Sequence, residues 1–128
     1  MNWLDSVTGS LLNKDLDGLW TRQRAISDNI ANVDTPGYKS KAVSFEDQLQ
    51  AQIQANTGNT AQTIRGIEET QPATGESNRG SLRLDGNNVD VEQQNVELAR
   101  TQLNYLYSLR ELSDHFSRLK YAITDGKS

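Results

Sequence analysis

The stretch LLNKDLDGLWTRQRAISDNIANV, residues 11–33, shows the clearest hydrophobic period of the chain. Seven positions, all apolar but one, recur in alternating steps of four and three, which is the a/d pattern of a heptad repeat. This pattern predicts an amphipathic helix that pairs with another helix. Gln23 is the single polar member, and a polar group at such a position commonly fixes register or partner number. The series is Leu12, Leu16, Leu19, Gln23, Ile26, Ile30 and Val33.

The C-terminal limit of this helix is expected near Asn32. Thr35 precedes Pro36, and the residue before a proline disfavours the α conformation. Pro36 and Gly37 then fit the two central positions of a type II turn, because proline presets φ and glycine accepts a positive φ. The chain is therefore expected to turn sharply after the helix.

A second helix is predicted from about residue 89 to the C-terminal end of the chain. Asp90 can cap it, and Gln93 three residues later completes the pattern of a capping box. The phase of its apolar stripe slips between Leu106 and Leu112, so the helix must locally overwind or change neighbours. The two helices would be about 35 Å and 50 Å long, too long to bury all their apolar surface against one another. The stripe is Val96, Ala99, Leu103, Leu106, Leu109, Leu112, Phe116, Leu119 and Ile123.

The segment after the turn is predicted to form a short amphipathic element. Phe45, Leu49 and Ile53 supply its apolar side. Glu46 and Asp47 lie near its start, where acidic groups interact favourably with a helix dipole.

The middle of the chain has the composition of a loop. From residue 55 onward Thr, Gln, Asn, Gly and Ser dominate. Within this region, residues 63–67 are predicted to pair with residues 81–84 as a small β-hairpin.

These elements place the chain in the mainly α class. Long N- and C-terminal helices are expected to form a coiled-coil domain, with a polar loop and short β-hairpin region between them. The expected divisions are an N-terminal helix at 1–35, a turn and short amphipathic segment at 36–54, a polar loop region at 55–88 and a C-terminal helix at 89–128.

The composition indicates a chain that needs partners. Apolar residues make up 34% of it, and adding glycine gives roughly 41%, below the ~45–50% of globular domains. So little buriable surface hardly offsets the conformational entropy lost on folding. Thirteen basic and seventeen acidic side chains give a net charge of −4, and the absence of a run of Lys or Arg argues against nucleic acid.

The chain shows no sign of a cleaved export signal or a membrane span. Residues 1–6 lack the basic and apolar regions of a secretory signal, and no stretch approaches ~20 apolar residues. Cysteine is absent, which excludes disulfides and thiolate metal sites. The expectation is a cytoplasmic protein, or one exported by a route that does not cleave a signal.

Three patterns that superficially suggest chemistry are better explained by structure. His115 is the only histidine, and no nucleophile elbow or glycine-rich oxyanion loop accompanies it, so a polar position beside Phe116 is favoured over a hydrolytic triad with Asp114 and Ser117. Residues 85–90 carry oxygen ligands, but their spacing does not fit an EF-hand, and a turn leading into a helix cap is favoured over a calcium site. Trp20, Tyr105 and Tyr107 are interpreted as packing residues, because no basic groove accompanies them. We therefore expect no catalytic residue, no metal and no cofactor.

One motif is specific enough to indicate a family. The segment SDNIANVDTPGYK, residues 27–39, resembles the N-terminal signature shared by the rod, hook and hook-associated proteins of the bacterial flagellar axis. Residues 85–92, 97–105 and 116–123 resemble the proximal rod members of that family more closely. In one of these rod proteins the second helix typically opens with an Asn-Pro element, which is missing here; that relative is the alternative within the family. The motif residues are Asn29, Asn32, Thr35, Pro36, Gly37 and Tyr38.

The resemblance implies a structural subunit of the proximal rod with a D0-type domain of terminal helices. Such subunits are exported through the flagellar type III apparatus without a cleaved signal peptide. Their termini are largely unfolded as monomers and become helices on assembly into a tube that surrounds the export channel and transmits torque. The implied partners are copies of the chain, other rod proteins and the adaptor to the membrane-embedded MS ring, with no nucleic acid and no small-molecule substrate. The implied location is the basal-body rod in the periplasmic space.

The apolar stripes are expected to form the assembly interface. Two rival classes remain: a generic exported coiled-coil adaptor, which would share the heptads but not the Thr-Pro-Gly-Tyr turn, and an enzyme, for which no catalytic group is found. The two stripes are expected to face each other partly within the subunit and partly across subunits. The interface residues are Leu12, Leu16, Leu19, Ile26 and Ile30 on the first helix, and Leu103, Leu106, Leu112, Phe116, Leu119 and Ile123 on the second.

Overall fold

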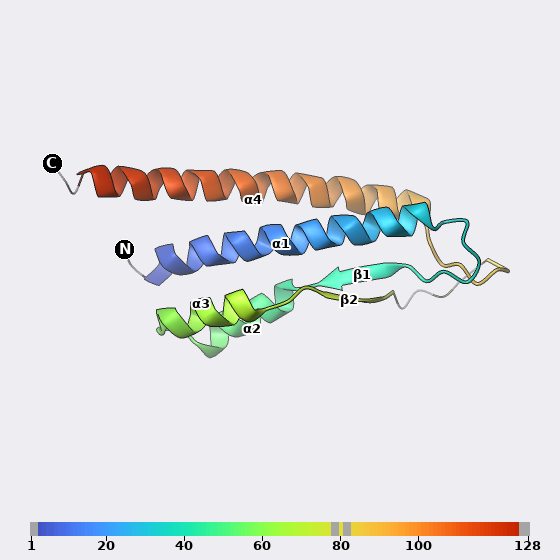
Figure 1. Cartoon of the computed structure of the whole chain (residues 1–128), viewed down its shortest axis with the longest axis horizontal. Coiled ribbons are helices and arrows are strands. Elements are labelled where there is room, and N and C mark those ends of the chain that lie inside the picture. Colours follow the sequence, from blue (N-terminus) through green and yellow to red (C-terminus); the bar gives the residue numbers. More distant parts are fainter. Residues whose placement is uncertain (1–2, 78–79, 81–82, 126–128) are drawn as a thin grey trace. The chain divides into compact units, whose positions relative to one another are not determined.

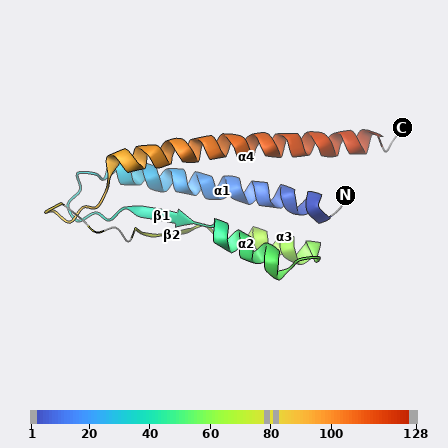
Figure 2. The same cartoon turned by 180° about the vertical axis from the view of Figure 1, so that it is seen from behind.

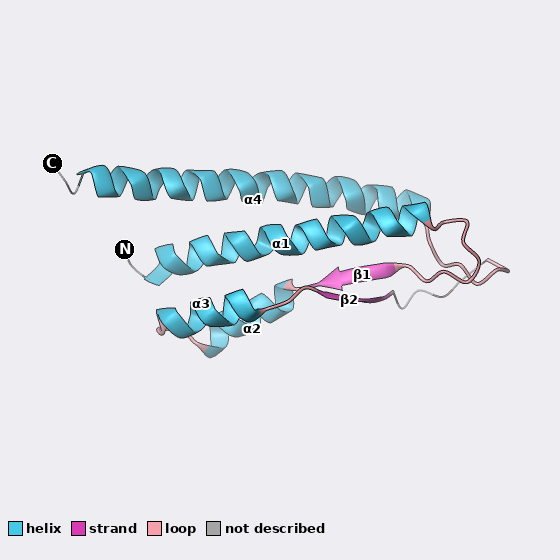
Figure 3. Ribbon diagram, viewed as in Figure 1, coloured by secondary structure: helices cyan, strands magenta, loops and turns pink. Residues whose placement is uncertain are grey.

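The protein is described by a computed structural model that covers residues 3–77, 80 and 83–125 (Figure 1). Long helices near the two ends and a small two-stranded sheet between them confirm the predicted fold class (Figure 3). In chain order the described elements are α1 (Trp3–Ala31), β1 (Lys41–Ser44), α2 (Glu46–Ala55), α3 (Thr60–Glu69), β2 (Ala73–Glu76) and α4 (Val91–Asp125).

The chain divides into two compact units, and each takes part of both long helices. The first unit contains the described parts of Met1–Leu16, Glu46–Thr70 and Tyr105–Ser128. The second contains those of Asp17–Phe45 and Gln71–Asn104. Within each unit the segment of α4 runs antiparallel to the segment of α1, as both views show (Figures 1 and 2).

α1 ends where the sequence predicts. Its last residue is Ala31, and the Asn32 side chain folds back to donate a hydrogen bond to the carbonyl of Asp28 at 2.8 Å. The same carbonyl also accepts a hydrogen bond from the backbone N–H of Asn32 at 3.1 Å, so both groups of Asn32 close the last turn of the helix.

The first unit contains a hairpin of two short helices, α2 and α3. The predicted amphipathic segment is confirmed as α2, with Glu46 and Asp47 in its first turn and Leu49 buried. Asn59 caps α3 by accepting a hydrogen bond from the backbone N–H of Gln62 at 3.1 Å. The two helices approach closely at Gly66, where an added Cβ would lie 2.2 Å from the side-chain oxygen of Gln52.

The predicted strand at residues 63–67 is wrong, because these residues lie in α3. Thr63, Ile67 and Thr70 are buried at spacings of four and three, which is a helical period. Of its expected partner, residues 81–84, residues 81 and 82 lie outside the described residues. The sheet instead pairs β1 with β2 in antiparallel register, from Lys41 opposite Glu76 to Ser44 opposite Ala73.

The second unit packs β1 onto α1. Phe45, directly after β1, is fully buried. Its ring lies so close to α1 that a Cβ added at Gly18 would come within 2.4 Å of it. Glycine is therefore required at this point of α1, despite its cost of about 1 kcal/mol within a helix.

α4 begins as predicted. The Asp90 side chain accepts a hydrogen bond from the backbone N–H of Gln93 at 3.2 Å, which is the expected N-cap contact. None of the helices in the described part of the chain is long and apolar enough to cross a membrane.

Candidate functional site

The motif residues after α1 form the expected type II turn. The N–H of Tyr38 donates a hydrogen bond to the carbonyl of Thr35 at 3.2 Å, and Gly37 has a φ of 74°. Pro36 and Gly37 thus occupy the two central positions, as predicted. Ahead of the turn, the Thr35 hydroxyl donates a hydrogen bond to the Asn32 side chain at 3.0 Å, which ties the turn to the end of α1.

Asn29 joins three segments of the second unit. It is fully buried, and its side-chain nitrogen donates hydrogen bonds to the carbonyl of Lys41 and to the side-chain oxygen of Gln94, both at 2.9 Å. Its side-chain oxygen accepts hydrogen bonds from the N–H of Lys41 at 2.8 Å and from the hydroxyl of Tyr38 at 3.2 Å. A single amide therefore holds β1, the turn and the start of α4 against α1.

The loop before α4 binds the turn from the other side. The N–H of Gly37 donates a hydrogen bond to the carbonyl of Asp85 at 2.7 Å. The side-chain nitrogen of Asn87 donates hydrogen bonds to the carbonyls of Asn32 and Thr35, both at 2.9 Å. We call this set of residues, completed by Asn88, the polar junction: Asn29, Asn32, Thr35–Tyr38 and Asp85–Asn88.

Asn88 completes the contact between the loop and the strand. Its side-chain oxygen accepts a hydrogen bond from the N–H of Ser40 at 2.6 Å, and its own N–H donates one to the carbonyl of Tyr38 at 3.3 Å. The sequence pattern of residues 85–90 predicted only a turn and a helix cap. The contacts of Asn87 and Asn88 with a segment about fifty residues away have no local signal in the sequence.

Two side-chain oxygens of this loop accept hydrogen bonds from the backbone of the loop itself. Asp85 accepts a hydrogen bond from the N–H of Asn87 at 3.1 Å, and Asn87 accepts one from the N–H of Val89 at 2.8 Å. Residues 85–90 form a turn that leads into the N-cap at Asp90. Throughout the described ranges, no group of three or more His, Asp or Glu residues is placed to hold a metal ion.

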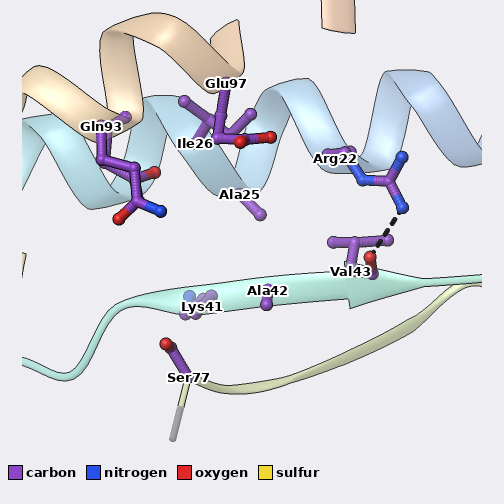
Figure 4. Close-up of a pocket in the computed structure, with 10 residues that line it drawn as sticks. Arg22, Ala25, Ile26, Lys41, Ala42, Val43, Ser77, Gln93 and Glu97 are labelled. Atoms are coloured by element: carbon purple, nitrogen blue, oxygen red, sulfur yellow. Dashed lines mark hydrogen bonds between the residues drawn. The ribbon is translucent and has the colours of Figure 1, made fainter. Parts of the chain in front are cut away.

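A hollow of about 310 Å³ lies beside the junction, between α1, β1 and the start of α4 (Figure 4). Arg22 reaches from α1 toward β1, donates a hydrogen bond to the carbonyl of Val43 at 2.8 Å, and lies 4.9 Å from the centre of the Phe45 ring. These contacts make Arg22 a structural residue that fastens β1 to α1. Sequence reasoning missed it, because an arginine on a predicted helix is usually solvated.

Gly37→Val is expected to loosen the polar junction. Nothing lies within 4 Å of a Cβ at this position, so the penalty comes from the positive φ, which a β-branched residue adopts at a cost of about 2 kcal/mol. Hydrogen exchange at the amides of Tyr38 and Asn88 should accelerate accordingly. Gly75→Val is the matched control, since Gly75 also has open space but lacks a positive φ. Equal exchange in the two variants would contradict the role assigned to the turn.

Polar and apolar residues alternate on the face of α4 that packs on α1. Its least exposed residues recur in steps of four and three. In the second unit Gln94 bonds Asn29; in the first, the Ser108 hydroxyl donates a hydrogen bond to Asp15, and His115 is buried with its ring against Gly9. We call this series the seam: Gln94, Leu98, Thr101, Tyr105, Ser108, Leu112, His115 and Leu119.

The predicted interface residues separate into two groups. Leu19, Ile26 and Leu112 are buried, and Leu12, Leu16, Ile30 and Leu119 are half-buried. Leu103, Leu106, Phe116 and Ile123 are exposed in the single chain. The phase slip in the apolar stripe separates residues on the face toward α1 from exposed residues. Leu112 and Leu119 belong to the seam, whereas the other large apolar residues of the predicted stripe lie outside it.

Those other residues are large apolar side chains on α4 that the described part of the chain leaves exposed. We call this set the outer stripe: Val96, Leu103, Leu106, Leu109, Phe116 and Ile123, which are 46% to 62% exposed. Scattered exposed apolar residues are normal, whereas six large ones on a single helix are typical of an interaction surface.

Comparisons with known proteins agree with the motif. Residues 20–39, which include the first half of the polar junction, match the family model described as flagella basal body rod protein. The chain is 35% identical to the flagellar basal body rod protein FlgB of Bacillus subtilis over 109 residues, which cover 83% of this chain and 84% of the relative. It is 31% identical to FlgB of Borrelia hermsii over 125 residues, covering 88% and 93%, and 29% identical to FlgB of Escherichia coli over 116 residues, covering 82% and 84%.

Proposed function

The chain belongs to the FlgB family of flagellar basal body rod proteins, and on this premise we propose that it assembles through its terminal helices into the proximal rod. Its role is structural and not enzymatic. The similarity to FlgB proteins and the missing Asn-Pro element favour this role over that of the other proximal rod protein or of a generic exported adaptor.

The outer stripe is the observation that carries the proposal. The chain pairs α4 with α1 through a seam in which polar and apolar residues alternate, and it leaves the outer stripe exposed. Burying a leucine or phenylalanine contributes about 1.5–3 kcal/mol. This free energy becomes available only when neighbouring subunits cover the stripe, so assembly and the ordering of the terminal helices are coupled.

The polar junction has a different role in the same process. Its hydrogen bonds fix where the chain leaves α1 and where it enters α4, and those described above all lie within the second unit's own residues. When the chain leaves α1 and enters α4 in the same way in every subunit, all subunits have the same geometry, which a regular tube requires. The junction therefore sets the shape of the subunit and the outer stripe joins subunits together.

The proposed partners follow from this position in the rod. They are copies of the chain, other rod proteins and the adaptor to the MS ring, with the type III export apparatus as a transient partner. In the assembled state the subunit surrounds the export channel in the periplasmic space and transmits torque. Its export proceeds without a cleaved signal peptide.

Deletion and complementation test the proposal. A bacterium that lacks the gene for this subunit should be non-motile and should lack the rod, and the cloned gene should restore both. An antibody against the chain should detect it in basal bodies purified from the complemented strain. Normal motility in the deletion strain, or purified basal bodies without the chain, would overturn the proposed function.

A further inference from the structure

A groove in the first unit lies between α1 and α2. Its volume is about 510 Å³. Its walls are mainly apolar and come from Leu11 and Leu12 on α1 and from Leu49 and Ile53 on α2. Asp15 and Glu46 also line it and give it an acidic edge. The sequence pattern marked Leu12 and Ile53 as apolar positions but gave no sign that a hollow separates them.

The chain does not bring its own outer stripe to this groove. In the first unit α4 turns its seam toward α1, where Ser108 bonds Asp15 and His115 lies against Gly9. Leu109 and Phe116 are exposed on a different face of α4. One subunit thus carries an apolar groove and an apolar stripe that cannot meet within it.

The charges beside the two surfaces are complementary. The groove has the carboxylates of Asp15 and Glu46 on its edge. Beside the part of the outer stripe between Leu109 and Phe116, exposed Lys120 lines a shallow hollow together with both apolar residues. Opposite charges across a contact favour one pairing of surfaces and one register over others.

We propose that the groove between α1 and α2 receives the segment of the outer stripe around Leu109 and Phe116 from a second copy of the chain. This inference rests on the proposed function, because it requires that copies lie next to one another in the rod. The contact joins two different surfaces, so it is heterologous, and a heterologous contact that does not close on itself generates an open helical array. Such an array is the form that a rod needs.

Cysteine crosslinking in purified basal bodies tests the proposal. The natural chain has no cysteine, so introduced thiols are unique. Gln50→Cys places a thiol on the groove, and Ser113→Cys places one between Leu109 and Phe116 with little change in size. A chain that carries both thiols should give a ladder of dimers and higher multimers with a bismaleimide reagent, because each copy then offers both surfaces.

Matched controls separate this contact from simple proximity. Gln48→Cys places the thiol on the side of α2 away from the groove, and Asp114→Cys places it on another face of α4. Pairing Gln48→Cys with Ser113→Cys, or Gln50→Cys with Asp114→Cys, should lose the ladder. A ladder of equal yield in these pairs would overturn the proposal.

The single variants test the other possible occupants. Dimers from Ser113→Cys alone would show that two stripes meet, and dimers from Gln50→Cys alone would show that two grooves meet. Crosslinks from Gln50→Cys only to a different rod protein would show that this protein fills the groove. Each of these results would contradict the inferred pairing.

A charge reversal tests the register. Lys120→Glu should lower the yield of the ladder, and Glu46→Lys in the same chain should restore it. An unchanged yield in Lys120→Glu would contradict the charge pairing on which the choice of partner depends. The presence of each variant in basal bodies is measured first, so that the two proposals can be distinguished. A chain that is present but not crosslinked refutes the pairing. Absence of the natural chain from basal bodies refutes the proposed function.

Discussion

Leu103→Asp is expected to abolish incorporation of the subunit into the rod without unfolding it. Leu103 belongs to the outer stripe and is 54% exposed in the single chain, so the substitution takes little from the packing of the subunit. In the assembly the leucine would be covered, which contributes about 1.5–3 kcal/mol, and a buried aspartate would add a desolvation cost of similar size. Together these terms amount to about 4 kcal/mol, or roughly a thousandfold in the association constant.

Asn104→Asp is the control for this prediction. It introduces the same charge at the next residue, which is also exposed but is not part of the outer stripe. Immunoblots of purified basal bodies should contain the control variant at the natural level and lack Leu103→Asp, with both variants present in whole cells. Equal incorporation of the two variants would mean that the outer stripe is not an assembly surface.

Asn29→Ala is expected to destabilise the polar junction by about 3 kcal/mol. The substitution removes four hydrogen bonds and leaves the N–H and carbonyl of Lys41 without their partner. Each buried polar group left unpaired costs about 1–3 kcal/mol, which is more than the bond itself contributes. The loss should appear as a roughly hundredfold faster hydrogen exchange at the amides of Ser40 and Asn88.

Asp28→Ala provides the comparison. Asp28 precedes Asn29, but its side chain is exposed and makes an ion pair with Lys41 at 3.7 Å. Exposed ion pairs contribute about 0–1 kcal/mol, so this variant should exchange nearly as the natural chain does. If both variants exchanged alike, Asn29 would not be the residue that holds the junction.

The local features of the fold were predictable from short segments. The end of α1 near Asn32, the turn at Pro36 and Gly37, and the cap at Asp90 all depend on residues that lie within a few positions of one another. In each case the physical cause is local: a restricted φ, a permitted positive φ, or a side chain that accepts a nearby N–H.

The wrong strand prediction concerns a segment whose conformation depends on packing against another part of the chain. Residues 63–67 contain Thr and Ile, which favour strands, yet packing against α2 makes them helical. The apolar stripe of α4 was expected to face α1 partly within the subunit and partly across subunits, and the sequence did not indicate that Ser108, His115 and Gln94 share the face toward α1 through contacts with Asp15, Gly9 and Asn29. Periodicity marks an apolar face but does not say whether that face turns inward or toward another molecule.

Hydrogen exchange compared between the isolated subunit and purified basal bodies tests the central claim most directly. Peptides from residues 105–125, which carry much of the outer stripe, should exchange rapidly in the isolated subunit and slowly in the rod. Peptides from the polar junction at residues 29–41 should be protected in both. Slow exchange of residues 105–125 in the isolated subunit, equal to that in the rod, would contradict the account, because the terminal helices would then be complete without neighbours.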